Sequence, residues 1–301
     1  MIIALAGATA ISFAPLLYIR SDTTALTGAF YRMFYALPIL GILVFVSKKE
    51  DARDKNSRWL AFGAGILLAI DFAGYHTAID YIGSGIATMI GNSQVIIVTL
   101  ASWWLFGERP NRFILLSLPM VMLGLLLISG IWDDDPFGDD PVKGVIGGMV
   151  AAVFYSSFLI AYRQSNRIAA PAVNAQFDAT AGAALGILIL GTIPPTSLGL
   201  QAIDHSITWP SHGWLLFLAI FCQVIGWIAI TYALPRLPAA HTSFAVLLQP
   251  VLTIIWGVII LNESPSLQQS AGMVLIFAAI IAVTLFGDTE QSTPSLENLE
   301  S

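Results

Sequence analysis

The chain has 301 residues, of which 56% are apolar and only 11% are charged, and its mean hydropathy is +0.79. A soluble globular protein carries about 25% charged residues, so this composition excludes an ordinary soluble domain. The net charge of −6 argues against a surface that binds nucleic acid. The single cysteine, Cys222, excludes an internal disulfide framework and a multi-cysteine metal site. A polytopic membrane protein remains.

Apolar runs long enough to cross a bilayer follow one another along the whole chain. A membrane-spanning helix needs about 20 apolar residues, and we predict ten such helices, so the fold class is an all-α polytopic membrane protein. Their ranges are 1–18, 24–46, 59–79, 84–106, 112–131, 144–162, 171–192, 213–233, 240–261 and 267–286. No basic segment precedes the first run, so we expect a retained helix and not a cleaved signal. Residues 287–301 are polar and are predicted to form a disordered cytoplasmic tail.

The distribution of Lys and Arg predicts the orientation, because basic loops stay cytoplasmic. With both termini inside, the outer loops carry only Arg20 and Lys143, and Arg32 lies within a helix. The inner loops carry the other ten: Lys48, Lys49, Arg53, Lys55, Arg58, Arg109, Arg112, Arg163, Arg167 and Arg236. We therefore predict a plasma (cell inner) membrane protein whose termini are both cytoplasmic.

The sequence also indicates an internal repeat. A shift of 155 positions superposes the third to fifth runs on the eighth to tenth without a gap. The matched pairs include Trp59 and Trp214, Gln94 and Gln249, Glu108 and Glu263, and Pro110 and Pro265. We predict a first repeat over 1–131, an acidic external loop over 132–143 and a second repeat over 144–286. Five helices per repeat require the second copy to be inverted, an arrangement that places a shared site at the membrane midplane. The alternative is a duplication without alternating access, as in a channel.

Four segments resemble those of a known family. Residues 107–110 (GERP) close the fourth run and residues 262–265 (NESP) close the ninth, while 29–34 (AFYRMF) and 71–79 (DFAGYHTAI) carry an arginine and an aspartate/histidine pair. With ten helices in two halves, the chain resembles the drug/metabolite transporter superfamily, EamA type. The resemblance implies two inverted five-helix repeats and export or exchange of small metabolites such as amino acids. The sequence departs from the family at Val95, where members often carry proline, and in the seventh run, which has Gln176 and Asp178 but no arginine.

Polar residues within the apolar runs predict the site. An ionised side chain at the bilayer centre is costly and usually faces a partner or a wet cavity. At about 1.5 Å per residue, Arg32, Asp71, Asn92 and Gln223 reach a common depth. Arg32 and Asp71 could form a fixed ion pair that positions two helices, or a site in which Arg32 holds a carboxylate and Asp71 exchanges a proton.

Further candidates surround this layer. Tyr75 is one turn from Asp71 and could supply a hydroxyl or an aromatic wall. His76 has Asp80 one turn above it and is either a structural histidine or a proton relay. Gln94 and Gln249 could bind solute or bridge helices, and Trp227 could be a stacking wall or a tryptophan that faces lipid or the core. Glu108 and Glu263, at helix ends, are interpreted as positioning their helices. The histidines are not grouped as a metal site would require.

The sequence therefore predicts a secondary transporter of small polar solutes, an exporter or exchanger without cofactor, acting by alternating access. The chain has no Walker loop, so we expect no direct use of ATP. A passive channel is the alternative, although no ring of charges is evident. An intramembrane enzyme is a remote one, suggested only by Gly83-Ser84-Gly85 with a distant histidine. The expected partners are a small solute and the lipid bilayer, and the sequence leaves a homodimer open.

Overall fold

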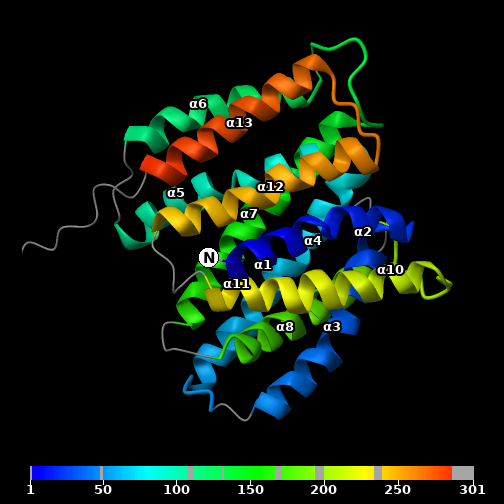
Figure 1. Cartoon of the computed structure of the whole chain (residues 1–301), viewed down its shortest axis with the longest axis vertical. Helices are drawn as coiled ribbons and strands as arrows, with labels where there is room; N and C mark the ends of the chain where they lie inside the picture. Colours follow the sequence, from blue (N-terminus) through cyan, green and yellow to red (C-terminus); the bar gives the residue numbers. More distant parts are fainter. Residues whose placement is uncertain are drawn as a thin grey trace, which may run out of the picture.

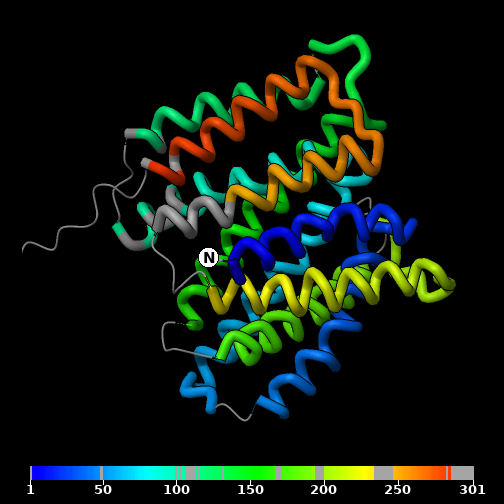
Figure 2. Tube along the Cα trace, in the orientation of Figure 1, coloured from blue at the N-terminus to red at the C-terminus, as the bar shows by residue number. Residues whose placement is uncertain are grey.

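The fold is described from a computed structural model, which describes residues 2–47, 50–107, 112–130, 132–166, 171–193, 200–233 and 239–286. Within these ranges the regular secondary structure is helical, as predicted. The elements are α1 (Ile2–Ser12), α2 (Ala14–Ser21), α3 (Ala25–Ser47), α4 (Lys55–Asn92), α5 (Gln94–Phe106), α6 (Arg112–Ile128), α7 (Pro141–Ser165), α8 (Ala172–Thr192), α10 (Ser211–Phe217), η1 (Leu218–Gly226), α11 (Trp227–Ala233), α12 (Ala239–Ile260) and α13 (Leu267–Phe286). Lys48, Lys49, Glu108, Arg109, Arg167, Arg236 and the tail 287–301 lie outside the described residues and are drawn in grey in Figure 2.

The helices run roughly alongside one another in one direction of the molecule (Figure 1). In this view α6 lies beside α13 at one edge, and α3 and α8 lie at the opposite edge. α4 packs against both α7 and α8. Among the described residues, six helical segments are long and apolar enough to cross a membrane: Ile2–Ser21, Ala25–Ser47, Lys55–Leu105, Pro141–Ser165, Ala172–Thr192 and Ser211–Ala233. Shorter apolar helices cover Leu115–Ile128, Leu247–Ile260 and Leu267–Ala282.

The segment Lys55–Leu105 contains a reversal of direction. Its 51 residues would extend about 77 Å as one straight helix, more than twice the hydrocarbon thickness of about 30 Å. The backbone leaves the helical region at Gly83, with φ 77° and ψ 169°, a conformation that side chains other than hydrogen disfavour. We expected the third and fourth runs to be separated by a short connection, and the structure replaces it with this single glycine.

Local sequence explains where other helices begin and end. The first predicted run is divided at Phe13, because Pro15 occupies the first turn of α2 and has no backbone N–H to donate. Pro38 and Pro119, by contrast, lie inside α3 and α6 without ending them. The side chain of Asp54 accepts a hydrogen bond from the Ser57 amide at the start of α4. α4 consequently begins four residues before the predicted third run.

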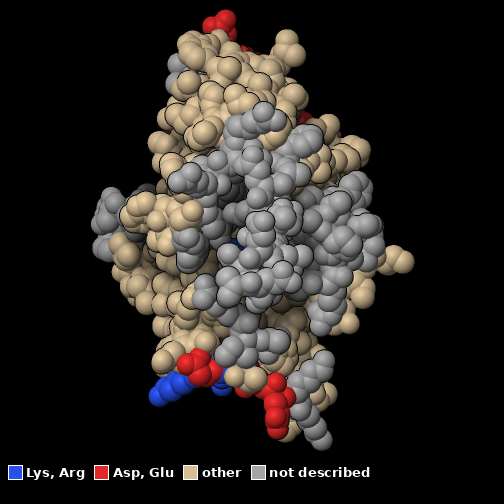
Figure 3. All heavy atoms as spheres, turned by 90° about the vertical axis from the view of Figure 1, so that its left-hand side faces the viewer, with Lys and Arg blue, Asp and Glu red and all other residues tan. Residues whose placement is uncertain are grey.

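The connections gather at two ends of the molecule. We call the end with the α3–α4 connection (50–54) the inner end and the end with the α6–α7 connection (129–140) the outer end. Figure 3 looks onto the inner end, where charged side chains collect at the lower edge. The sequence predicts that this end faces the cytoplasm.

Candidate functional site

Arg32 on α3 is the most deeply buried cation in the apolar part of the molecule, with 3% of its surface exposed. Its Nε donates a hydrogen bond to Oε1 of Gln223, at 2.9 Å, and its guanidinium carbon lies 4.4 Å from the centre of the Phe72 ring. The ring face is the negative side of the aromatic quadrupole and attracts a cation. Arg32 is therefore held between α4 and η1 by a side-chain amide and an aromatic ring.

Asp71 does not pair directly with Arg32, so the ion pair we considered from the sequence is not formed. Both residues are described, and their charged atoms do not approach within 4.0 Å. The physical reason is that the guanidinium is turned toward Phe72 and Gln223. Asp71 is 8% exposed and still close enough to interact electrostatically with Arg32, Tyr75 and Tyr155. The two charges therefore face one region without neutralising each other by contact.

Gln223 links this region to the second half of the chain. Its side chain is fully buried, and its Nε2 has no hydrogen-bond partner within the described residues. A buried amide donor without a partner costs about 1–3 kcal/mol. Arg32 and the Nε2 group are both donors, so a solute that brings an acceptor oxygen would satisfy them.

We call the region around Arg32, Asp71 and Gln223 the central site, and tyrosines complete it. The Tyr75 hydroxyl and the Thr88 hydroxyl lie 2.6 Å apart, across the reversal at Gly83. Tyr155 on α7 interacts electrostatically with both Arg32 and Asp71, and Trp227 packs edge to face against it, with ring centroids 6.3 Å apart. Phe72 and Tyr155 are not among the site residues predicted from the sequence. A tyrosine hydroxyl in the middle of an apolar run was the available signal for Tyr155, whereas nothing local marks Phe72.

Other predicted candidates lie elsewhere. His76 is buried, with its ring stacked on Tyr18 at 4.0 Å and its Nδ1 donating to the Ala25 carbonyl at 3.1 Å. Asp80 accepts from the Tyr18 hydroxyl instead of from His76. The Asn92 amide donates to the Thr88 carbonyl of its own helix. These contacts fit the structural reading of His76.

The repeat-related glutamines are not brought into the central contacts. The side-chain Oε1 of Gln94 is buried without a hydrogen-bond partner in the described part of the chain. The backbone carbonyl of Gln94 accepts a hydrogen bond from the Ser156 hydroxyl. The Gln249 carbonyl accepts from Thr253 on its own helix. The structure therefore assigns neither glutamine to a solute or to a bridge between helices.

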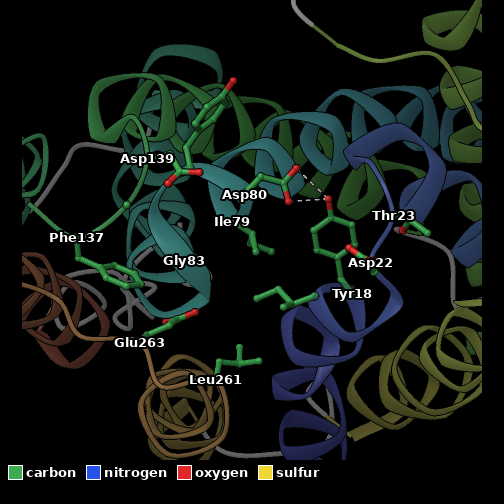
Figure 4. A pocket seen from close by; sticks show the side chains of 13 residues that line it. Tyr18, Asp22, Thr23, Ile79, Asp80, Gly83, Phe137, Asp139, Leu261 and Glu263 are labelled. Atoms are coloured by element: carbon green, nitrogen blue, oxygen red, sulfur yellow. Dashed lines mark hydrogen bonds between the residues drawn. The ribbon is translucent and has the colours of Figure 1, made fainter. Parts of the chain in front are cut away.

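A cavity of about 470 Å³ opens at the outer end (Figure 4). Carboxyl groups from four different parts of the chain line it: Asp22, Asp80, Asp139 and Glu263. Its lining includes neither Lys nor Arg. The Tyr18 hydroxyl and the Asp80 carboxylate meet across one wall, 2.9 Å apart, and the ring of Tyr18 packs on His76 beneath. We call this cavity the outer vestibule.

Glu263 holds one wall of the outer vestibule. Its carboxylate accepts hydrogen bonds from the backbone amides of Ser84 and Gly85, where the helix resumes after Gly83. A helix N-terminus favours a negative charge, so Glu263 stabilises the reversal in α4, as the helix-positioning interpretation predicts. The Ser84 hydroxyl is buried and has no hydrogen-bond partner among the described residues.

The inner end is tied by an ion network. Arg53, whose side chain is fully buried, bonds Asp51 at 2.7 Å and Asp178 of α8 at 2.8 Å. Arg58 also contacts Asp178, at 3.3 Å. The hydrogen bonds from Arg53 hold the pKa of the Asp51 carboxyl below its usual value of 3.8. We call these four residues the inner ion network.

The EamA-like transporter family matches residues 1–130 and 142–285. The chain belongs to this family. This membership, together with the apolar helices, makes it a multi-pass membrane protein of a transporter family. The two matched ranges are close to the two predicted repeats.

Relatives of this EamA-like protein are transporters of uncharacterised activity. It is 24% identical over 260 residues to the uncharacterised transporter YcbK of Bacillus subtilis, covering 83% of this chain and 80% of YcbK. It is 25% identical over 246 residues to the uncharacterised inner membrane transporter YhbE of Escherichia coli K12, covering 77% and 71%. An uncharacterised transporter of Archaeoglobus fulgidus is 24% identical, covering 84% and 86%.

A solved crystal structure has the same fold. It superposes with a TM-score of 0.60 at 18% identity, over 95% of this chain and 96% of the other. At that identity the likeness concerns the fold alone. In this EamA-like protein the function of the central site must therefore be argued from its own residues.

Proposed function

We propose that the protein is a secondary transporter of small polar solutes that works by alternating access around the central site formed by Arg32, Asp71, Tyr75 and Gln223. The supporting observation is Arg32 itself, a buried cation without a direct carboxylate partner. A charge in an apolar interior is costly unless it pairs or faces a wet cavity. A solute carboxylate would supply that partner.

The solute class follows from the groups present. Arg32 and Gln223 Nε2 are donors for a carboxylate, Asp71 is an acceptor for an ammonium group or a proton, and Tyr75 and Tyr155 provide aromatic walls. Amino acids and similar zwitterions combine these complementary groups. In this proposal the chain folds as two inverted five-helix repeats with both termini cytoplasmic, and it exports or exchanges its solute.

Two features support alternating access in particular. The outer vestibule opens one end, while the inner ion network and aromatic packing close the other. Inverted repeats give a carrier two such states of related geometry. A passive channel would instead need a continuous wet path.

Counterflow in proteoliposomes tests the proposal. Vesicles loaded with an unlabelled neutral amino acid should accumulate the same labelled compound transiently, and a metabolite panel screened by thermal shift identifies further solutes. A flux that internal solute does not accelerate would point to a channel.

Arg32→Ala should abolish binding of carboxylate-bearing solutes, and unchanged affinity would make Arg32 structural.

Asp71→Asn should suppress pH-driven transport while the protein still inserts, and normal gradient-driven transport would refute its proton role.

A further inference from the structure

The helix that carries Gln223 changes its winding on both sides of that residue. α10 and α11 are α-helical, but the nine residues between them, Leu218–Gly226, form the π-helix η1. π-helical turns are rare and often occur at functional sites. η1 carries Cys222 and Gln223, and Trp227 is the first residue after it. Gln223 of the central site and Trp227 are therefore joined through a π-helical segment, and the same residues could instead wind as an α-helix.

Trp227 follows Gln223 by four residues in the direction of the inner end and packs on α7. Its ring packs edge to face against Tyr155 and Phe158 of α7, with centroids 6.3 Å apart in both pairs. Phe158 in turn stacks on Tyr162, one turn closer to the inner end, at 5.2 Å. We call these four residues the inner aromatic layer.

The helices meet in two different ways, which indicates where movement is easiest. α4 and α8 are in backbone contact, because a Cβ on Gly65 would lie 2.0 Å from the Ala179 carbonyl oxygen. α4 and α7 meet similarly, with a Cβ on Gly74 reaching 2.7 Å from the Gly147 oxygen. α1 packs closely on η1 and α11 through Gly7. Small residues at such crossings give close, extensive packing between membrane helices.

Side chains make the contacts of α11 with α7 and of α2, which follows α1, with α4. Trp227 meets α7 through aromatic edges, and Tyr18 of α2 meets Asp80 and His76 through its hydroxyl and ring. Side-chain contacts can separate by rotamer changes, whereas interlocked backbones move together. The inner aromatic layer therefore lies on the interface that can open.

We propose that η1 and Trp227 form the inner gate of the carrier, and that Gln223 couples this gate to the occupancy of Arg32. This inference rests on the proposed function. Gln223 Oε1 accepts a hydrogen bond from Arg32 Nε. A solute that binds the guanidinium and moves it would therefore also displace Gln223, which lies near the middle of the π-helical segment. Loss of one residue's worth of π winding rotates the helix beyond it by about 100° relative to the helix before it. That rotation carries Trp227 away from Tyr155 and Phe158.

The native cysteine reports on this gate directly. Cys222 is the only cysteine of the chain, is fully buried on η1 and interacts electrostatically with Arg32. The experiment measures its reaction with a charged, membrane-impermeant methanethiosulfonate in inside-out and right-side-out vesicles. We expect slow reaction in the wild type, and an increase of about tenfold or more from the inner side alone in Trp227→Ala, corresponding to about 1.4 kcal/mol in the gating equilibrium. Gln223→Leu should produce an increase from the same side.

Trp214→Ala is the matched control, because it removes a partly exposed tryptophan from α10 of the same membrane-spanning segment, and it should leave the rate unchanged. Phe158→Ala removes the opposite wall and provides a second route should Trp227→Ala not elute as a folded protein. Unchanged protection in both variants, or an equal rise from both sides, would overturn the gate. A rise in Trp227→Ala without one in Gln223→Leu would overturn the coupling.

Wild-type counterflow in the same vesicles separates this inference from the proposed function. If the wild type shows counterflow but Cys222 stays protected in the variants, the protein is a carrier and the gate proposal is wrong. If Cys222 becomes reactive from one side but no solute of the panel shows counterflow, Trp227 closes the inner side and the carrier proposal is wrong.

Discussion

At the scale of single residues, the polar side chains separate into those that hold the fold and those that remain available. Arg53, Asp51, Asp178 and Glu263 have short, direct partners. Gln223 and Asp71 do not have all their polar groups satisfied by direct contacts in the described chain. The first set explains stability, and the second set is where a solute would gain binding energy.

Asp178 should be the more important acceptor of the inner ion network for stability. Asp178→Asn removes the charge that faces both Arg53 and Arg58, while Asp51 stays in place. Charged hydrogen bonds contribute about 1.5–3 kcal/mol, so we expect a loss of about 2 kcal/mol, measured by thermal unfolding in detergent. Asp134→Asn, an exposed carboxyl on the outer connection, is the control. Equal melting of the two variants would show that the network does not stabilise the fold.

The contribution of Asp51 should depend on pH. Its pKa is depressed in the folded protein, chiefly by the hydrogen bond from Arg53. A depressed carboxyl pKa stabilises the fold above the unfolded-state pKa, and this stabilisation is lost as pH falls through the folded-state value. The stability difference between wild type and Asp51→Asn should be constant from pH 8 to about pH 5 and shrink below about pH 4. A difference that grows on acidification would contradict the assignment.

At the scale of elements, two irregular segments determine the geometry of the site: the reversal at Gly83 and the π-helix η1. Gly83 lies in the short connection that the sequence predicts between its third and fourth apolar runs, whereas η1 interrupts the eighth run, 213–233, which the sequence presents as an ordinary helix. The first had a signal, since glycine tolerates a positive φ. The second had none, because hydrophobic patterning does not distinguish π from α winding over nine residues.

Gly83→Ala tests the reversal. Alanine at this position would have to adopt a φ of +77°, which side chains disfavour. Its Cβ would also lie 2.8 Å from the Phe137 ring and 2.9 Å from the Glu263 carboxyl carbon. Backbone strain of this kind costs about 1–3 kcal/mol, so the melting temperature should fall. Gly63→Ala, in the same helix with open space around the new Cβ, should instead stabilise by about 0.5–1 kcal/mol. Comparable effects of the two variants would argue against the reversal.

Deletion of Ile225 tests the winding of η1. Its side chain is 53% exposed, so the deletion removes no core group and allows the segment to become α-helical. The deletion removes the extra residue that the π winding accommodates, so Trp227 keeps nearly its orientation relative to Gln223 and the segment can no longer alternate between the two windings. Cys222 should therefore stay protected while counterflow is lost. Ile225→Ala removes the side chain while keeping the register and is the matched control. A deletion variant that supports counterflow as well as Ile225→Ala does would mean that the winding has no part in gating.

At the scale of the whole molecule, the described chain has a vestibule at one end and an ion network at the other. The sequence allowed the helical class, the family and the apolar runs to be predicted, because these depend on composition and period. Phe72 and Tyr155 could not be placed beside Arg32, because their proximity depends on the packing of three helices. The inverted repeat and the orientation stay predictions.

Single-cysteine labelling tests the orientation. In a Cys222→Ser background, Asp134→Cys should react with an impermeant reagent from outside the cell, and Asn56→Cys only after the inner face is exposed. Both positions are exposed in the structure, so burial does not limit either reaction. The reverse pattern would place the inner ion network outside the cell and would remove the basis for calling its end cytoplasmic.

The carboxyl groups of the outer vestibule have a consequence for the path of a dipolar molecule. Four acidic side chains surround the mouth, and the buried guanidinium of Arg32 lies farther in. In the proposed carrier, a zwitterion that passes from the outer vestibule to Arg32 would meet a negative potential first and a positive charge second. Its ammonium end would then turn toward the mouth and its carboxylate toward the interior, so the molecule would be aligned before it reaches Arg32.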